Sequence, residues 1–150
     1  MKTTARFENA IHKLYDAFNN DTLHPEYCHR CAVGNMLDNV DSWRHLTNRH
    51  GSLELNYVGI VNQKFGKRFG GYTPLELLNI EATFLKACGF ALPIIPNSKR
   101  PENPTNKDLL FQGLAAVISY LCALDSIPNV MEYTQVFEAA LPKRSVAVAV

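Results

Sequence analysis

The segment after Thr105 constrains the fold most strongly, because apolar residues occupy nearly all of its sides at helical spacing. They are Leu109, Leu110, Leu114, Val117, Ile118, Leu121 and Cys122. A helix that is apolar all round has to be covered by other elements. We therefore expect the central helix of a helical bundle here, capped by Thr105 and carrying Asp108 in its first turn.

Two further long helices are predicted by their periodicity and their end signals. Thr73 to Glu76 form a capping box with Pro74 at the first helical position, and Gly89 ends the helix that it opens. At the N-terminus, apolar residues recur at helical spacing up to a stop near Asn19. They are Phe7, Ile11, Leu14, Tyr15 and Phe18.

The connecting segments carry weaker signals. We expect a helix from about Glu26 to Leu37, with Pro25 in its first turn, although Gly34 weakens it by roughly 1 kcal/mol. A short helix carrying Trp43 and Leu46 is expected from residue 41 or 42 to Gly51, and a last helix from Pro128. Residues 53–61 fit both a strand and a helix; we favour the helix, because no partner strand is nearby.

Together these patterns predict an all-α fold, a single-domain bundle of about five or six helices. The four prolines between Leu92 and Thr105 predict an extended loop before the central helix. We place the domain at residues 1–142 and expect residues 143–150, which end in Val-Ala-Val-Ala-Val, to be a flexible apolar tail. A length of 150 residues with 47% hydrophobic and 19% charged residues suits one globular core.

The charge balance disfavours several classes of partner. A formal net charge of +1 gives no global field for nucleic acid or for an anionic membrane. Bases alternate with aromatics from Lys64 to Tyr72, but we interpret this stretch as a solvated loop whose phenylalanines turn into the core. The sequence has no signal-peptide pattern at its start, and we expect no membrane span and a cytoplasmic location.

Potential metal ligands are concentrated in one stretch. All five histidines and two of the four cysteines lie between His12 and His50. Cys28 and Cys31 are separated by two residues, and thirteen residues then lead to His45 and His50. Two cysteines at this spacing reach one tetrahedral zinc ion from a single turn. The hypothesis is therefore a structural zinc held by Cys28, Cys31, His45 and His50.

Two alternatives to zinc remain open for the same residues. Cys28 and Cys31 are also spaced as a redox dithiol, with His29 as an acidifying neighbour, although such motifs normally follow a strand. In the other alternative Cys31 packs in the core as a small apolar residue and the histidines decorate a helix end. The sequence has no dinucleotide-binding, P-loop, nucleophile-elbow or His-Glu-x-x-His motif, so it favours a binding protein over an enzyme without deciding between them.

Four runs of the sequence resemble a family of short uncharacterised bacterial proteins. The runs are Cys31 to Asp38, Asp41 to Trp43, Asn56 to Gly59 and Asn103 to Asp108. Some relatives carry the name of a sodium-translocating NADH:quinone reductase, specifically of its iron–sulfur and flavin component, and the resemblance implies association with that respiratory enzyme. The cysteines of this chain lack the clustered spacing of an iron–sulfur ligand set, so no functional residue carries over.

The function expected from the sequence is a cytoplasmic helical binding or adaptor domain, with a structural zinc at the Cys/His cluster. Its partner would be another protein or a second copy of the chain. A dithiol redox protein and a component associated with a respiratory NADH:quinone reductase are the alternatives.

Overall fold

The computed structural model describes residues 4–40 and 42–127, which form helices joined by loops and contain no strand. The elements in chain order are α1 (Ala5–Asn19), α2 (Ala32–Met36), the 3₁₀ helix η1 (Ser42–Leu46), α3 (Tyr57–Lys64), α4 (Pro74–Ala87) and α5 (Lys107–Leu124). The all-α bundle expected from the periodicity is confirmed. The predicted last helix and the tail lie outside the described residues.

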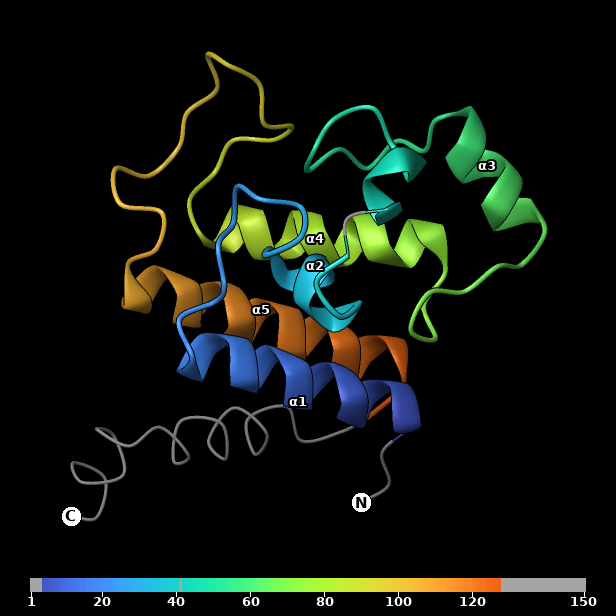
Figure 1. Ribbon diagram of the computed structural model, residues 1–150, viewed down its shortest axis with the longest axis horizontal. Helices are drawn as coiled ribbons and strands as arrows, with labels where there is room; N and C mark the ends of the chain where they lie inside the picture. The colour runs from blue at the N-terminus through green and yellow to red at the C-terminus, as the bar shows by residue number, and fades with distance from the viewer. Residues whose placement is uncertain (1–3, 41, 128–150) are drawn as a thin grey trace.

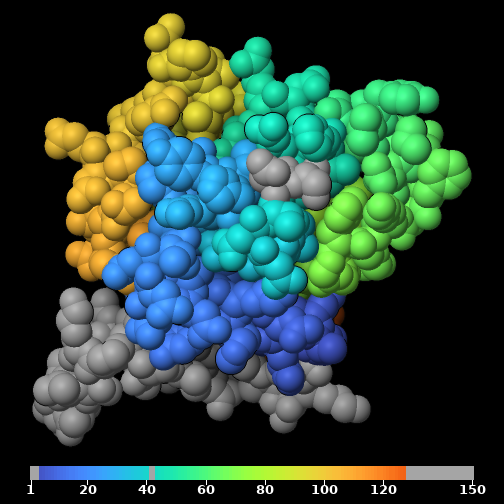
Figure 2. All heavy atoms as spheres, in the orientation of Figure 1, coloured from blue at the N-terminus to red at the C-terminus, as the bar shows by residue number. Residues whose placement is uncertain are grey.

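Helix α5 lies between α1 and α4, in contact with both, while α2 packs on α1 and α4 (Figure 1). The α5 side chains Leu114, Val117 and Leu121 are fully buried, as expected for the central helix. Figure 2 shows the chain from α1 to η1 across the middle of one face, with the proline-rich loop on one side and α3 on the other. The core therefore lies where α5, α4 and α1 meet beneath this segment.

Helix α5 is, among the described residues, the one helix long and apolar enough to cross a membrane by length and composition. Core helices of soluble proteins meet the same criterion. Helix α5 contacts α1 and α4 in the bundle, and 39% of its apolar window is buried.

Helix α1 ends where the sequence predicts, and helix α4 both begins and ends where the sequence predicts. Thr4 caps α1, and its hydroxyl accepts a hydrogen bond from Phe7 N. The capping box of α4 is complete: Thr73 Oγ1 accepts from Glu76 N at 3.2 Å, and Glu76 Oε1 accepts from Thr73 N at 2.9 Å. Leu75, in the first turn of α4, is 41% exposed.

The segment 53–61, which fitted both a strand and a helix, is irregular up to residue 56 and helical from Tyr57, where α3 begins. The N-cap of α5 is Asn106 rather than Thr105. Asn106 Oδ1 accepts from the backbone N–H groups of Asp108 and Leu109, whereas the Thr105 hydroxyl bonds to Asn103.

The helix predicted from Glu26 to Leu37 is wrong over its first half. Helix α2 begins only at Ala32, and residues 25–30 form turns. The carbonyl oxygen of Cys28 does not accept a helical hydrogen bond, because it accepts from Trp43 Nε1 at 2.9 Å and from the Cys31 thiol at 3.3 Å. Tertiary contacts thus replace the first turns of the expected helix.

The short helix around Trp43 exists as η1 but ends at Leu46, not at Gly51. The carbonyl of Leu46 accepts a hydrogen bond from Asn56 N at 2.9 Å, so it is used by the chain that returns toward α3. Residues 47–55 consequently form a loop, and Gly51 takes a left-handed conformation within it (φ +87°). This loop carries His50.

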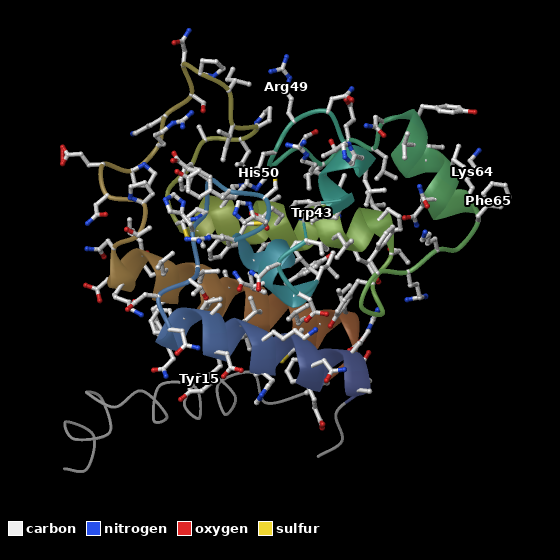
Figure 3. The ribbon with its side chains drawn as sticks, viewed as in Figure 1. Tyr15, Trp43, Arg49, His50, Lys64 and Phe65 are labelled. Atoms are coloured by element: carbon white, nitrogen blue, oxygen red, sulfur yellow. The ribbon has the colours of Figure 1, made fainter. Side chains whose placement is uncertain are left out.

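The aromatic side chains of the basic stretch have different environments. Phe69 packs against the core, as expected for the phenylalanines of this stretch, and Tyr72 is buried as well. Phe65 is 84% exposed, which contradicts the expectation for this residue. Figure 3 shows Lys64 and Phe65 at the far end of α3, away from His50 and Trp43.

Candidate metal centre and the adjoining cavity

Three side chains from separate parts of the chain meet inside the protein. Cys31 is the N-cap of α2, His50 lies in the loop after η1, and Glu81 lies in the middle of α4. Their potential ligand atoms all lie within 4.8 Å of one another. We call these residues the Cys31–His50–Glu81 cluster.

Glu81 is the most unusual member, because its side chain is fully buried. One carboxylate oxygen, Oε1, accepts a hydrogen bond from Val33 N at 3.1 Å, and Oε2 lies 3.0 Å from His50 Nε2. A buried carboxylate is stable only when hydrogen bonds or opposite charges compensate its lost hydration. Glu81 therefore ties the start of α2 and the His50 loop to α4.

Cys31 is held by two local contacts. Its Sγ accepts from Gly34 N at 3.3 Å, as an N-cap does, and lies 3.3 Å from the carbonyl oxygen of Cys28, to which the thiol donates. Burial raises the pKa of the Cys31 thiol well above its usual value, and the charge of Glu81 raises it further. Without a metal ion the thiol is protonated at neutral pH.

His50 is oriented by Glu81 on one side and by an aromatic ring on another. The rings of Trp43 and His50 meet edge to face, with centroids 6.1 Å apart. Trp43 itself is 1% exposed and fixed by its hydrogen bond to Cys28 O. In Figure 3 His50 lies over α4, whereas Arg49 projects from the outer side of the same loop.

The structure brings together two of the four ligands predicted from the sequence. Cys31 and His50 belong to the cluster; Cys28 and His45 do not. Cys28 is half-buried, and His45 is exposed on η1. Both nevertheless line, together with His50, a cavity of about 590 Å³ next to the cluster. We call this space the His50 cavity.

Sequence reasoning missed Glu81, which lies 31 residues beyond His50. A signal for it was present: Glu81 follows Leu78 by three positions and precedes Leu85 by four, on the buried stripe of α4. A charged residue on such a stripe has to be paired inside the protein.

The geometry argues against nucleophilic chemistry at Cys31. A nucleophilic cysteine needs a low thiol pKa and access to a substrate. Cys31 has a raised pKa and no exposed surface. The arrangement instead brings one sulfur, one nitrogen and one oxygen donor within 4.8 Å of one another, and these are donor types that zinc accepts.

Comparison of the chain with protein-family models, with curated proteins and with solved structures found no match. The cluster and the cavity are therefore the features from which a function can be inferred.

Proposed function

We propose that the protein is a cytoplasmic helical binding domain whose Cys31–His50–Glu81 cluster binds one zinc ion. The observation that supports this most directly is the convergence of three ligand atoms, within 4.8 Å of one another, from three elements. Ligands about 2.0–2.3 Å from a tetrahedral zinc lie roughly 3.3–3.8 Å apart, so only small side-chain adjustments are needed.

Charge also favours a cation at this point. A divalent ion would compensate the buried carboxylate of Glu81 and allow the Cys31 thiol to ionise, with release of its proton. Zinc accepts mixed sulfur, nitrogen and oxygen ligand sets, whereas magnesium and calcium require oxygen ligands. Zinc is therefore the metal that this donor set fits best.

The ion would join three parts of the chain and would keep one coordination position free of protein ligands. It would join the start of α2, the His50 loop and α4, which the hydrogen bonds of Glu81 already connect. Three protein ligands leave the fourth tetrahedral position for water. His50 belongs to the cluster and also lines the His50 cavity, so a zinc ion would fix one wall of that cavity.

The test is elemental analysis of the untagged full chain, purified under reducing conditions from zinc-supplemented medium. We expect about one zinc per chain, as for other structural sites. Glu81→Gln and Cys31→Ser should each weaken zinc affinity by at least about tenfold, because losing even a group that only orients a metal ligand costs that much, and should lower the zinc retained after dialysis. The matched controls Cys28→Ser and His45→Asn should retain the metal, because neither residue belongs to the cluster.

Two results would overturn this assignment. Loss of zinc from the Cys28 and His45 variants, with full zinc in Glu81→Gln, would instead support the ligand set predicted from the sequence. Wild-type protein without zinc, and with the same melting temperature before and after a chelator, would mean that the cluster is only a hydrogen-bonded part of the core.

The remaining alternatives have less support. A redox role for Cys28 and Cys31 conflicts with the buried, protonated state of Cys31. A protein partner or a second copy of the chain stays a proposal, supported by the large exposure of Tyr57 (81%) and Phe65 (84%) on and beside α3. Association with a respiratory NADH:quinone reductase is also still a prediction, to which the described residues add no observation.

A further inference from the structure

We infer that the outer face of α3 is an interface with a second copy of this chain, in which the two α3 helices pair antiparallel across a two-fold axis. This names the partner of the binding domain proposed above. It rests on that proposal for the binding role alone and does not depend on the zinc ion. Three observations support it: exposed apolar side chains gather at α3, its amphipathic pattern is reversed, and its charges are self-complementary.

The exposed large apolar side chains of the described residues are concentrated at α3. Those on the helix or in the segments beside it are Leu53, Tyr57, Val58, Ile60, Phe65 and Leu75. Those in other parts of the described chain are Tyr27, Val40 and Ile95. Leu75 lies beside α3 because its backbone N–H donates to Gln63 Oε1 at 2.9 Å. Exposed apolar surface that is gathered in this way marks an interaction site.

The amphipathic pattern of α3 is reversed. Gly59 is buried against the carbonyl of Leu46, and Gln63, one turn later, is the acceptor for the Leu75 N–H. The opposite side of the helix carries Tyr57, Ile60 and Lys64, at spacings of three and four residues. A surface helix normally turns its apolar side toward the core. In α3 the apolar side is turned outward, where a partner can cover it.

The position of α3 leaves this side accessible. The helix packs on η1 and α4 with its inner side. Figure 2 shows α3 at the edge of the molecule, and Figure 3 shows Lys64 and Phe65 on its outer side. A helix of another molecule can therefore approach to the usual packing distance of about 8–10 Å.

The charges near this face favour a second copy over an anionic membrane. Glu54 precedes the helix, whereas Lys64 and Lys67 are at its other end. None of the three forms an ion pair in the described chain, and Lys67 Nζ lies 5.4 Å from the centre of the Phe69 ring. A negative membrane surface would attract the lysine end and repel Glu54. A second copy in the antiparallel orientation brings opposite charges together at both ends.

Full overlap of the two helices places the two-fold axis between residues 60 and 61, in the middle of α3. Lys64 then lies opposite Tyr57 of the second copy, where an ammonium group can contact the aromatic ring. Lys67 lies opposite Glu54 of the second copy. Each contact occurs twice, because a two-fold interface uses the same surface on both molecules. A parallel pair would instead place the lysines of the two copies side by side.

Light scattering of the full-length protein tests the inference. From about 10 µM to 1 mM we expect the mass to rise from that of one chain toward that of two. Tyr57→Ser and Phe65→Ser should each weaken the dimer at least about tenfold, as for aromatic anchors of an interface. Their circular dichroism spectra should match wild type, since both side chains are more than 80% exposed. The control Ile95→Ser removes an exposed apolar side chain away from α3 and should change the affinity less than about twofold.

Reversal of charges tests the antiparallel orientation. Glu54→Lys and Lys67→Glu should each weaken the dimer about fivefold or more, because each change turns two attractive contacts into repulsive ones. The double variant Glu54→Lys/Lys67→Glu should recover most of the wild-type affinity, since opposite charges face one another again. Lys99→Glu, in the proline-rich loop, is the matched control and should have little effect.

Three results would overturn the inference. One is the mass of a single chain at every concentration; cosedimentation with phosphatidylserine vesicles would then assign the face to a membrane. The others are equal weakening by Ile95→Ser and a charge-swapped double variant as weak as the single variants. All measurements are made on zinc-loaded and on chelator-treated protein. A dimer that persists without zinc leaves this inference standing even where the zinc proposal fails.

Discussion

At the scale of single residues, two glycines allow backbone segments to approach closely around the cluster. A Cβ at Gly34 would lie 2.3 Å from Cys28 O and 2.6 Å from the His29 carbonyl carbon, both of them backbone atoms. A Cβ at Gly59 would lie 2.2 Å from Leu46 O. Glycine at position 34 lowers the helix propensity of α2, but it allows the Cys28 turn to pack against the α2 backbone. This packing positions Cys31.

We predict that Gly34→Ala destabilises the protein by at least about 2 kcal/mol, because the clash is with backbone that cannot move aside cheaply. Helix propensity alone would predict a gain of about 1 kcal/mol. Urea unfolding followed by circular dichroism measures the difference.

Gly66→Ala is the matched control for this substitution. Gly66 has a left-handed conformation (φ +74°) and open space around it, so alanine should cost only about 1 kcal/mol. A Gly34→Ala protein as stable as wild type would contradict the packing described for the Cys28 turn.

At the scale of elements, an ion pair joins the beginning of α1 to the end of α5. Arg6 donates to the carboxylate of Asp125 and to Gly71 O at 2.8 Å, and its guanidinium lies 4.4 Å from the centre of the Tyr72 ring. Thr4 Oγ1 donates to the other carboxylate oxygen of Asp125 at 2.6 Å. An acidic C-cap opposes the helix dipole, so Asp125 depends on these partners.

The contacts of Asp125 predict a pH dependence. Burial acts to raise the pKa of Asp125, but hydrogen bonds from Arg6 and Thr4 outweigh it, and the net pKa lies below the usual value. A carboxyl group with a lowered folded-state pKa stabilises the fold above its unfolded-state pKa of about 3.9, and this contribution is lost as the pH falls through the folded-state value.

Asp125→Asn should therefore destabilise the protein at pH 7 by about 2 kcal/mol, the usual contribution of hydrogen bonds to a charged group. The difference from wild type should shrink as the pH is lowered from about 5 to below the folded-state pKa. Urea unfolding across this range measures it, with the exposed Glu102→Gln as control. A difference that stays constant with pH would show that the Asp125 carboxylate is not stabilised as described.

At the scale of the whole molecule, the bundle encloses most of its thiols. Cys31, Cys88 and Cys122 have no exposed surface, and Cys28 is half-buried. Cys88 lies where α4 packs on α5: its thiol donates to Leu109 O at 3.4 Å, and a Cβ at Gly113 would lie 2.6 Å from its Sγ. Burial raises the pKa of Cys88 to about 12 and also raises that of Cys122.

We predict that iodoacetamide labels Cys28 first in native, chelator-treated protein at pH 8. The three buried thiols should react more slowly by roughly a factor of 100 or more, because they need both an opening of the bundle and ionisation. Mass spectrometry of digested protein assigns the labelled cysteines, and all four should react in urea. Rapid labelling of Cys88 in the native protein would contradict the packing of α4 on α5.

The sequence by itself determined the helices whose signals are local. The capping box at Thr73, the periodicity before Asn19 and the apolar surface of α5 all act within a few turns of chain, and each of these helices formed, although Asn106 rather than Thr105 caps α5. The same local rules failed from Glu26 to Cys31, because the Cys28 carbonyl bonds to Trp43, fifteen residues away.

Only the tertiary structure decided the composition of the candidate site. Sequence spacing grouped Cys31 and His50 with Cys28 and His45, whereas folding placed Glu81 of α4 beside the first two. Spacing along the chain specifies partners within one turn or hairpin, but not which side chain of a distant helix faces a loop. That choice depends on how α2, α4 and the His50 loop pack, since the buried carboxylate of Glu81 has to find its hydrogen-bond partners there.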